Sequence, residues 1–217
     1  MRQTELSAVA AGYQMFQAAL LDGRLRPGQF VSQKDLGAML NLSVGALREI
    51  LPRLQSERLL LVQPKRGIQI PVVDLPMIRD AFQLRAALER EAVVQAIRKV
   101  EDAVLEEQRH RHEEILAQLA QSDGHHVPVD GQKVDEDLHS LLMNATENEL
   151  LMQAHHLNTI RMRMIRLDRI KLTRITLPSA FADHLAIIDA ILMRDKHLAI
   201  DAMDLHVANA RDRAMEL

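Results

Sequence analysis

The stretch that decides the fold of the N-terminal part is SQKDLGAMLNLSVGALREILPRLQSERL, residues 32–59. Ser32 stands three residues before Asp35, a spacing typical of a capping box that begins a helix. Asn41 suits the left-handed turn that ends such a helix, and Ser43 is then placed to cap a second one. Apolar residues at helical spacing follow both serines. The stretch therefore predicts two helices joined by a tight turn.

The flanking residues complete a larger motif. Residues 4–22 carry apolar side chains at helical spacing and predict an amphipathic helix. On the other side, 59–62 and 68–72 are short β-prone runs around a Pro- and Gly-bearing turn, which predicts a hairpin. Helix, short helix, tight turn, helix and hairpin together predict a winged helix-turn-helix domain over residues 1–73.

Beyond Asp74, a capping residue ahead of Pro76, the pattern changes to long helices and predicts a second domain over residues 74–217. The polar segment 122–132 carries Gly and Pro and predicts a loop. The expected helices cover 75–98, 100–121, 133–146, 148–172, 178–194 and 196–215. The fold class is therefore mainly α, with an all-helical bundle after the winged domain.

Charge and composition narrow the function. The chain of 217 residues has a net charge of −3, yet residues 1–73 hold nine Lys and Arg against five Asp and Glu, a net of +4. A basic domain on an acidic body indicates a polyanionic partner for the basic part. There is no cysteine, which excludes disulfides and thiolate ligands and fits a reducing compartment. No segment reads as a signal peptide or membrane span, so we expect a cytoplasmic protein with no membrane partner.

Several motifs resemble one family of bacterial regulators. LLDGRLRPG at 20–28, LGAMLNLSVGALREILPRLQSERL at 36–59 and PKRG at 64–67 resemble the winged domain of GntR-type transcription regulators. LRAALEREAV at 84–93 and DEDLHSLLMNATEN at 135–148 resemble the FCD ligand-binding domain of the FadR/FCD subfamily, in its six-helix VanR-like branch. The resemblance implies a DNA-binding repressor that acts as a homodimer on a palindromic double-stranded operator.

The resemblance also implies DNA contacts at Lys34, Ser43, Arg48, Arg66 and Gly67. Lys34 and Ser43 would touch phosphates, Arg48 would read a base from the recognition helix, and the last two would enter the minor groove from the wing. An alternative is that Arg48 only pairs with Glu49 or Asp35 on a solvated face. Val44 stands where the family has a base-reading arginine, which leaves the operator sequence open.

A metal site is predicted from Asp135 and His139, which stand one helical turn apart. His184 and His206 each lie in an apolar stripe of a later helix, and a buried imidazole must be hydrogen-bonded or ligated. The family motif matches all four residues, with Leu138 in place of the usual Phe. Three imidazoles and a carboxylate favour zinc, with nickel, manganese or iron as alternatives. The competing interpretation is a solvated Asp–His pair in a metal-free domain.

Arg85 lies on an apolar helix face, where it either pairs with Glu89 or takes the carboxylate of a small organic-acid effector. Arg161 and Arg163 are further candidates for the effector site, secondary to Arg85. The other histidines read as surface residues: His110, His112, His125, His126, His155, His156 and His197. We therefore expect a metal-binding, ligand-responsive regulator that is not an enzyme; the alternative from another class is a metalloenzyme that uses the Asp/His site on a small carboxylate.

Overall fold

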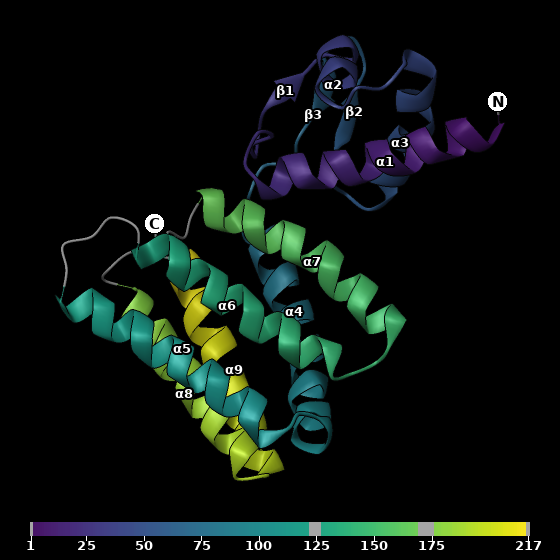
Figure 1. Cartoon of the computed structure of the whole chain (residues 1–217). Helices are drawn as coiled ribbons and strands as arrows, with labels where there is room; N and C mark the ends of the chain where they lie inside the picture. The colour runs from purple at the N-terminus through teal and green to yellow at the C-terminus, as the bar shows by residue number, and fades with distance from the viewer. Residues whose placement is uncertain (1, 122–126, 169–175, 216–217) are drawn as a thin grey trace. The chain divides into compact units, whose positions relative to one another are not determined.

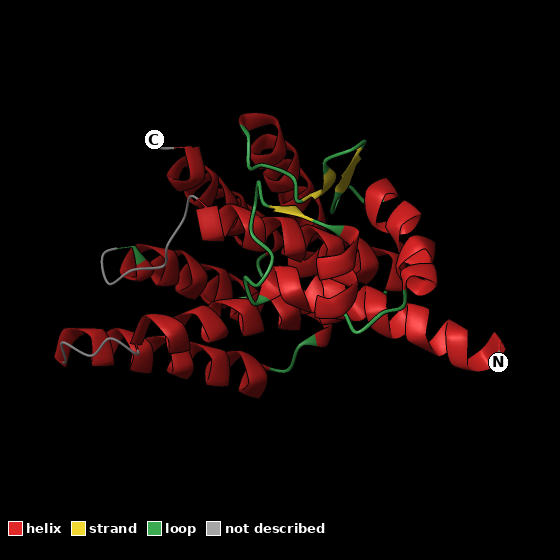
Figure 2. Ribbon diagram, turned by 90° about the horizontal axis from the view of Figure 1, so that it is seen from above, coloured by secondary structure: helices red, strands yellow, loops and turns green. Residues whose placement is uncertain are grey.

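The computed structural model describes residues 2–121, 127–168 and 176–215. They are mainly helical, and Figure 2 shows the described strands gathered in one small sheet. Packing divides the chain into two compact units. The winged-helix unit comprises Met1–Met77 and Thr159–Arg169, and the helical unit comprises Ile78–Asn158 and Ile170–Leu217. The expected boundary between residues 73 and 74 stays a prediction.

The winged-helix unit contains the predicted motif. It begins with α1 (Arg2–Leu21), followed by α2 (Gln33–Met39) and α3 (Val44–Ser56). Its antiparallel sheet has the order β1-β3-β2, from β1 (Phe30–Val31), β2 (Leu61–Gln63) and β3 (Gly67–Gln69). The predicted hairpin is confirmed, whereas β1 was not expected, because a strand of two residues leaves almost no alternation in the sequence.

The local chemistry of the two caps explains these helices. The Ser32 Oγ accepts the backbone N–H of Asp35 at 3.0 Å and donates to its carboxylate at 2.6 Å. The Ser43 Oγ accepts the N–H of Ala46 at 3.2 Å and so begins α3. Asn41, in the turn between them, has a φ of 49°. The tight turn was thus correctly predicted from residue types that tolerate or cap it.

The tip of the wing depends on a glycine. Gly67 has a φ of +98°, and a Cβ built there would lie only 2.9 Å from the carbonyl oxygen of Val31. Both the backbone conformation and the space exclude other residues. Gly67 therefore lets β3 lie close against the backbone at the end of β1.

Six helices follow among the described residues, as the sequence predicted (Figure 1): α4 (Leu75–Lys99), α5 (Asp102–Gln121), α6 (Val127–Asn144), α7 (Glu149–Asp168), α8 (Leu177–Leu192) and α9 (Lys196–Met215). Within the helical unit, α8 packs along α9, and α5 packs against both α6 and α8. In the described part of the chain, no helix combines the length and apolar character that a membrane crossing requires. A buried apolar cluster joins α5, α6 and α8 through Ile115, Leu119, Val134, Leu177 and Phe181.

The predicted loop at 122–132 is wrong for residues 127–132, which form the first turns of α6. Pro128 falls in the first turn of that helix, where its missing N–H costs no helical hydrogen bond. Gly131 serves packing, because a Cβ there would lie 2.5 Å from Cδ2 of Leu177. Residues 122–126, and the predicted end of the fourth long helix at 169–172, lie outside the described residues.

Candidate functional site

Three predicted metal ligands meet in the interior of the helical unit. His139 on α6, His184 on α8 and His206 on α9 form a buried group, the histidine cluster, whose candidate ligand atoms all lie within 4.8 Å of one another. Asp135, one turn before His139, places its Oδ1 at 3.6 Å from Nε2 of His184. The structure therefore brings together all four residues that the sequence singled out.

The burial of the cluster follows from the pattern of each helix. The buried face of α8 carries Phe181, His184 and Ile188, and that of α9 carries His206 between apolar residues. His184 is fully buried, while His139 and His206 are 6% and 2% exposed. Polar side chains at such depth require hydrogen bonds or a ligand to replace water.

Arg85 of α4 points into the same interior. Its Nε donates to Oε1 of Glu89 at 3.0 Å, so the intrahelical pair considered from the sequence is present. Its Nη2 also lies 2.5 Å from Nε2 of His139 and 3.3 Å from Nε2 of His206. Arg85 is thus held by a buried carboxylate on one side and by two members of the histidine cluster on the other. Its role toward an effector stays a prediction.

Each histidine of the cluster also has a polar neighbour at its other ring nitrogen. Nδ1 of His139 lies 3.1 Å from Oε2 of Glu89, and Nδ1 of His206 lies 3.7 Å from Oδ2 of Asp183. Nδ1 of His184 lies 3.0 Å from Nε2 of His112 on α5. The cluster is therefore surrounded by a second layer of polar groups from α4, α5 and α8.

The prediction for His112 is wrong. It was predicted to be a surface residue, but it is fully buried and packs on Phe181, with ring centroids 4.4 Å apart. The signal that could have found it is the stripe of buried residues on α5, which runs through Leu105, Gln108, His112, Ile115 and Leu119. The charged neighbours in the segment RHRHEE hide that stripe.

The prediction of a surface position is also wrong for His155, whose side chain is only 18% exposed. His110, His156 and His197 are exposed, as predicted. His125 and His126 lie outside the described residues.

Burial keeps the imidazoles of His139 and His184 neutral. Burial lowers the pKa of His139 to about 4, and burial together with neighbouring His206 holds the pKa of His184 well below its ordinary value. Burial would raise the pKa of the Glu89 carboxyl, but the Arg85 guanidinium and the neighbouring His139 together hold that pKa below its usual range. At neutral pH His139 and His184 are therefore neutral imidazoles beside the positive Arg85 guanidinium.

These groups fit a transition-metal ion. Nε2 of His184 is buried and has no hydrogen-bond partner among the described residues. Three neutral imidazoles with one carboxylate are a donor set that zinc, nickel, manganese and iron accept, whereas calcium and magnesium prefer oxygen. The chemistry of the residues thus agrees with the predicted metal class, and the ion itself stays a prediction.

The predicted DNA-contacting residues lie together in the winged-helix unit. Lys34, Ser43, Arg48 and Arg66 are exposed, and Gly67 is half-buried at the wing tip. Within the described part of the chain, Arg48 forms no ion pair with either Glu49 or Asp35, so the competing interpretation of Arg48 has no support. A shallow hollow of about 550 Å³ lies beside it, lined by Arg48, Leu51, Pro52, Gln55, Ser56 and Val62.

Arg161 has a partner within the winged-helix unit. It donates to the carbonyl of Glu57 at 2.8 Å, and Arg163 donates to the carbonyl of Leu21 at 2.7 Å. These carbonyls stand at the C-terminal ends of α3 and α1, where cationic side chains are favourable. Both arginines stabilise helix ends, and an effector role for Arg161 stays a prediction.

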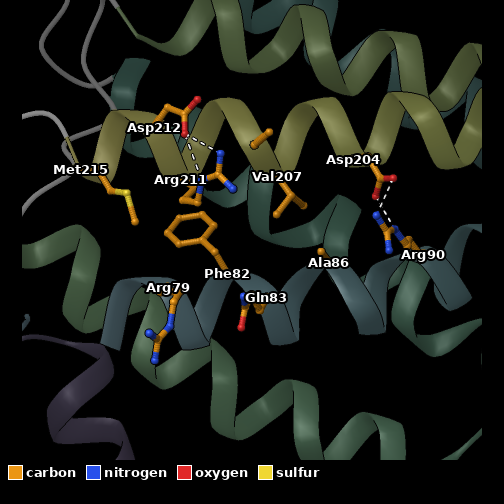
Figure 3. A pocket seen from close by; sticks show the side chains of 11 residues that line it. Arg79, Phe82, Gln83, Ala86, Arg90, Asp204, Val207, Arg211, Asp212 and Met215 are labelled. Atoms are coloured by element: carbon orange, nitrogen blue, oxygen red, sulfur yellow. Dashed lines mark hydrogen bonds and ion pairs between the residues drawn. The ribbon is translucent and has the colours of Figure 1, made fainter. Parts of the chain in front are cut away.

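A surface groove of about 490 Å³ runs between α4 and α9 (Figure 3), and no member of the histidine cluster lines it. Phe82 and Val207 form part of its floor. Its three arginines are already paired: Arg90 donates to both carboxylate oxygens of Asp204, Arg211 donates to Asp212, and Arg79 pairs with Asp80. The histidine cluster is therefore the stronger candidate site among the described residues.

Comparison with known proteins agrees with both units. Residues 11–70 match the model of the bacterial regulatory proteins of the gntR family, and residues 80–209 match the FCD domain. The HTH-type transcriptional regulator BphR of Paraburkholderia xenovorans is 25% identical over 94% of this chain and 84% of its own length. The HTH-type transcriptional repressor RspR of Escherichia coli is 20% identical over 94% and 88%.

A solved structure shows the same fold. The putative GntR transcriptional regulator from Rhodococcus sp. RHA1 superposes with a TM-score of 0.71 at 19% identity, over 96% of this chain and 98% of that chain. The matched families are regulators and not enzymes, so the metalloenzyme alternative is not supported. The chain belongs to the GntR family of bacterial transcription regulators, in the FadR/FCD subfamily with a winged helix-turn-helix and an FCD domain.

Proposed function

We propose that this regulator binds a divalent transition metal, with zinc preferred, at Asp135, His139, His184 and His206. The observation that carries the proposal is the convergence of three buried imidazoles from three helices. Burying so many polar nitrogens in an apolar interior is unfavourable unless they are hydrogen-bonded or hold a ligand, and Nε2 of His184 has no hydrogen bond among the described residues. The ion would supply positive charge and open coordination positions inside the helical unit.

The same region is suited to a small organic acid. Arg85 is the cation nearest the cluster, and a guanidinium takes a carboxylate through two parallel hydrogen bonds. A metal with four protein ligands would keep positions for an additional oxygen ligand where its coordination is octahedral. An acid that binds one arrangement of the helical unit better than another changes DNA affinity by that difference in binding free energy.

On DNA, we propose that a homodimer reads a palindromic operator and represses transcription until the acid binds. Two-fold symmetry would present two recognition helices α3 to two half-sites. Arg48 is exposed and without an ion pair to its neighbours Glu49 and Asp35, as a base-reading arginine must be before it binds. The relative RspR is a repressor, which favours the same direction here.

The test begins with the intact chain, purified without an affinity tag or chelator. Its metal content is measured by elemental analysis, and its operator is selected from random duplex DNA. Operator affinity is then measured for metal-loaded and metal-free protein while a panel of small carboxylic acids is titrated. We expect about one metal per chain and at least one acid that weakens DNA binding.

A matched pair of variants sharpens the test. Asp135→Asn removes a proposed ligand, whereas Asp137→Asn changes an aspartate on the same helix that pairs with Arg111 instead. Only the first should lower metal content. A metal-free protein whose operator affinity still responds to an acid would support the degenerate, metal-free regulator in place of this proposal.

A further inference from the structure

We propose that His112 is a positioning residue for the histidine cluster, which fixes the tautomer of His184 so that its Nε2 lone pair faces Asp135. The proposal deepens the proposed metal site and, for its metal-binding consequence, rests on it. It begins from a chain of buried hydrogen bonds that runs from the backbone of α5 to the centre of the cluster.

The hydrogen bond of His112 to the Gln108 carbonyl decides which atoms of that chain donate and which accept. Nδ1 of His112 lies 2.6 Å from the carbonyl oxygen of Gln108, and a carbonyl can only accept. Nδ1 of His112 therefore carries the proton. Because His112 is fully buried and its neutral form carries one ring proton, its Nε2 is left as an acceptor.

The tautomer of His112 determines that of His184. Nε2 of His112 accepts, so Nδ1 of His184, 3.0 Å away, must donate to it. The proton of the neutral His184 ring is thereby used at Nδ1, and its Nε2 carries a lone pair. That nitrogen is one of several buried atoms without a hydrogen bond among the described residues, and it lies 3.6 Å from Oδ1 of Asp135.

The other two histidines reach the same tautomer by another route. Arginine can only donate, so the two Nε2 atoms that contact Nη2 of Arg85 are acceptors, on His139 and on His206. Their protons therefore sit at Nδ1, toward Glu89 and Asp183. Arg85 sets two members of the cluster, and His112 sets the third, His184, with which Arg85 forms no hydrogen bond among the described residues.

Without His112, His184 would have a different preferred tautomer. Its Nδ1 would lose the acceptor, and a proton on Nε2 could instead be donated to the Asp135 carboxylate. In that tautomer the nitrogen nearest Asp135 has no lone pair for a metal. The ring would have to change tautomer before it could coordinate, which weakens metal binding without removing any ligand.

The experiment uses the full chain freed of metal by a chelator, with zinc alone as the probe. His112→Leu keeps an apolar side chain in the interior but has no acceptor, whereas His112→Gln offers a carbonyl oxygen to Nδ1 of His184. His110→Leu on the same helix is the control, because His110 is exposed and pairs with Glu114, away from the histidine cluster. Zinc affinity is measured by competition with a chromophoric chelator, and urea unfolding confirms that each variant is folded.

We expect His112→Leu to lower zinc affinity roughly 10- to 100-fold, His112→Gln to restore most of it, and the control to match the wild type. Nitrogen-15 NMR of the metal-free wild type should show Nδ1-protonated rings for His184 and His112, with the Nε2-protonated form of His184 gaining population in His112→Leu. If His184 is Nε2-protonated in the wild type, or if His112→Leu and His112→Gln both bind zinc as the wild type does, the proposal is overturned.

The two proposals can fail separately. A wild type that takes up no zinc but shows the expected tautomers contradicts the proposed metal site and retains the tautomer assignment. If His112→Leu does not fold, His112→Gln decides: a folded variant that keeps the Nδ1-protonated His184 and near wild-type zinc affinity supports the role of an acceptor. A folded His112→Gln with reversed tautomer and unchanged zinc affinity contradicts it.

Discussion

The two units of this regulator use polar side chains in opposite ways. In the winged-helix unit, the residues predicted to contact DNA are exposed, apart from the half-buried Gly67 at the wing tip. In the helical unit, the polar residues of the histidine cluster are almost inaccessible and hold one another through a continuous set of close contacts.

This difference agrees with the ligand that we propose for each unit. DNA is a solvated polyanion that binds to an open surface. Exposed cations are therefore sufficient, and each contributes a modest part of the binding free energy. A small ion or acid in an apolar interior needs every neighbour prearranged, because an unpaired buried group is costly. Single substitutions should therefore have large effects in the cluster and graded effects on the DNA surface.

The largest effect is expected from His184→Gln, which removes one proposed ligand from the cluster. We expect zinc affinity to fall more than about 100-fold, since even partners that only orient a ligand account for 10- to 100-fold. Isothermal titration of the metal-free chain measures it, with Asp137→Asn as the control. Unchanged zinc binding in His184→Gln would remove the cluster from the metal site.

Acid should weaken the helical unit of the metal-free protein. His139 is protonated at its ordinary pKa of 6.5 when unfolded but only at about 4 when folded, so the unfolded state takes up protons first. The free energy of unfolding should therefore fall between these values, by about 1.4 kcal/mol per pH unit for each such histidine. Urea titrations in chelator measure the slope. His139→Gln should flatten it and the exposed His197→Gln should not; equal slopes would contradict the argument.

Alkali should weaken the winged-helix unit instead. Burial and the hydrogen bond from Tyr13 to Glu57 raise the pKa of Tyr13 to about 12, above its ordinary value of 10.0. Stability from this tyrosine is complete below the ordinary pKa and is lost as pH rises toward the folded value. Unfolding followed between these pH values should show the loss, which Tyr13→Phe should abolish. A Tyr13→Phe variant with the same alkaline slope would rule the phenol out as its source.

On the DNA surface, Arg48→Ala should weaken operator binding by about 1–3 kcal/mol and relax base preference at one position. Its stability should not change, because Arg48 is exposed. Arg24→Ala, an exposed arginine paired with Asp22, is the control. Fluorescence anisotropy with the selected operator and its single-base variants measures both quantities, and uniform weakening across all bases would reassign Arg48 to a phosphate.

The smallest effect is expected from Lys34→Ala, which removes one proposed phosphate contact. The slope of log affinity against log salt should decrease by about 1, with the sequence preference unchanged. Affinities measured at several salt concentrations test this. A slope equal to that of the wild type would place Lys34 away from the DNA backbone.

Much of this organisation could be predicted from the sequence because its signals are local. Ser32 and Ser43 are typical N-cap residues, so they indicate where two helices begin. Asp135 and His139 are four residues apart, so helix geometry alone places them on the same face. His184 and His206 were found because each interrupts an apolar stripe. The family resemblance then connected segments that are far apart in the chain.

What could not be predicted depends on contacts between helices. His112 lies in a charged run, and its burial is decided by Phe181 and His184 of another helix. The start of α6 was missed because Gly131 reads as a loop residue until Leu177 is seen against it. Arg85 could be paired with Glu89 from the sequence, but its contacts with two histidines required the fold.

Those contacts of Arg85 have a consequence for how an ion would enter. The guanidinium holds the Nε2 lone pairs of His139 and His206, and one lone pair cannot serve both an N–H group and a metal. Metal uptake would therefore be an exchange of one cation for another, with a net affinity equal to the difference between two sets of bonds. The exchange would also free the guanidinium to bind a carboxylate. Because Arg85 cannot hydrogen-bond the two histidines and an acid at the same time, the ion and the acid would bind cooperatively.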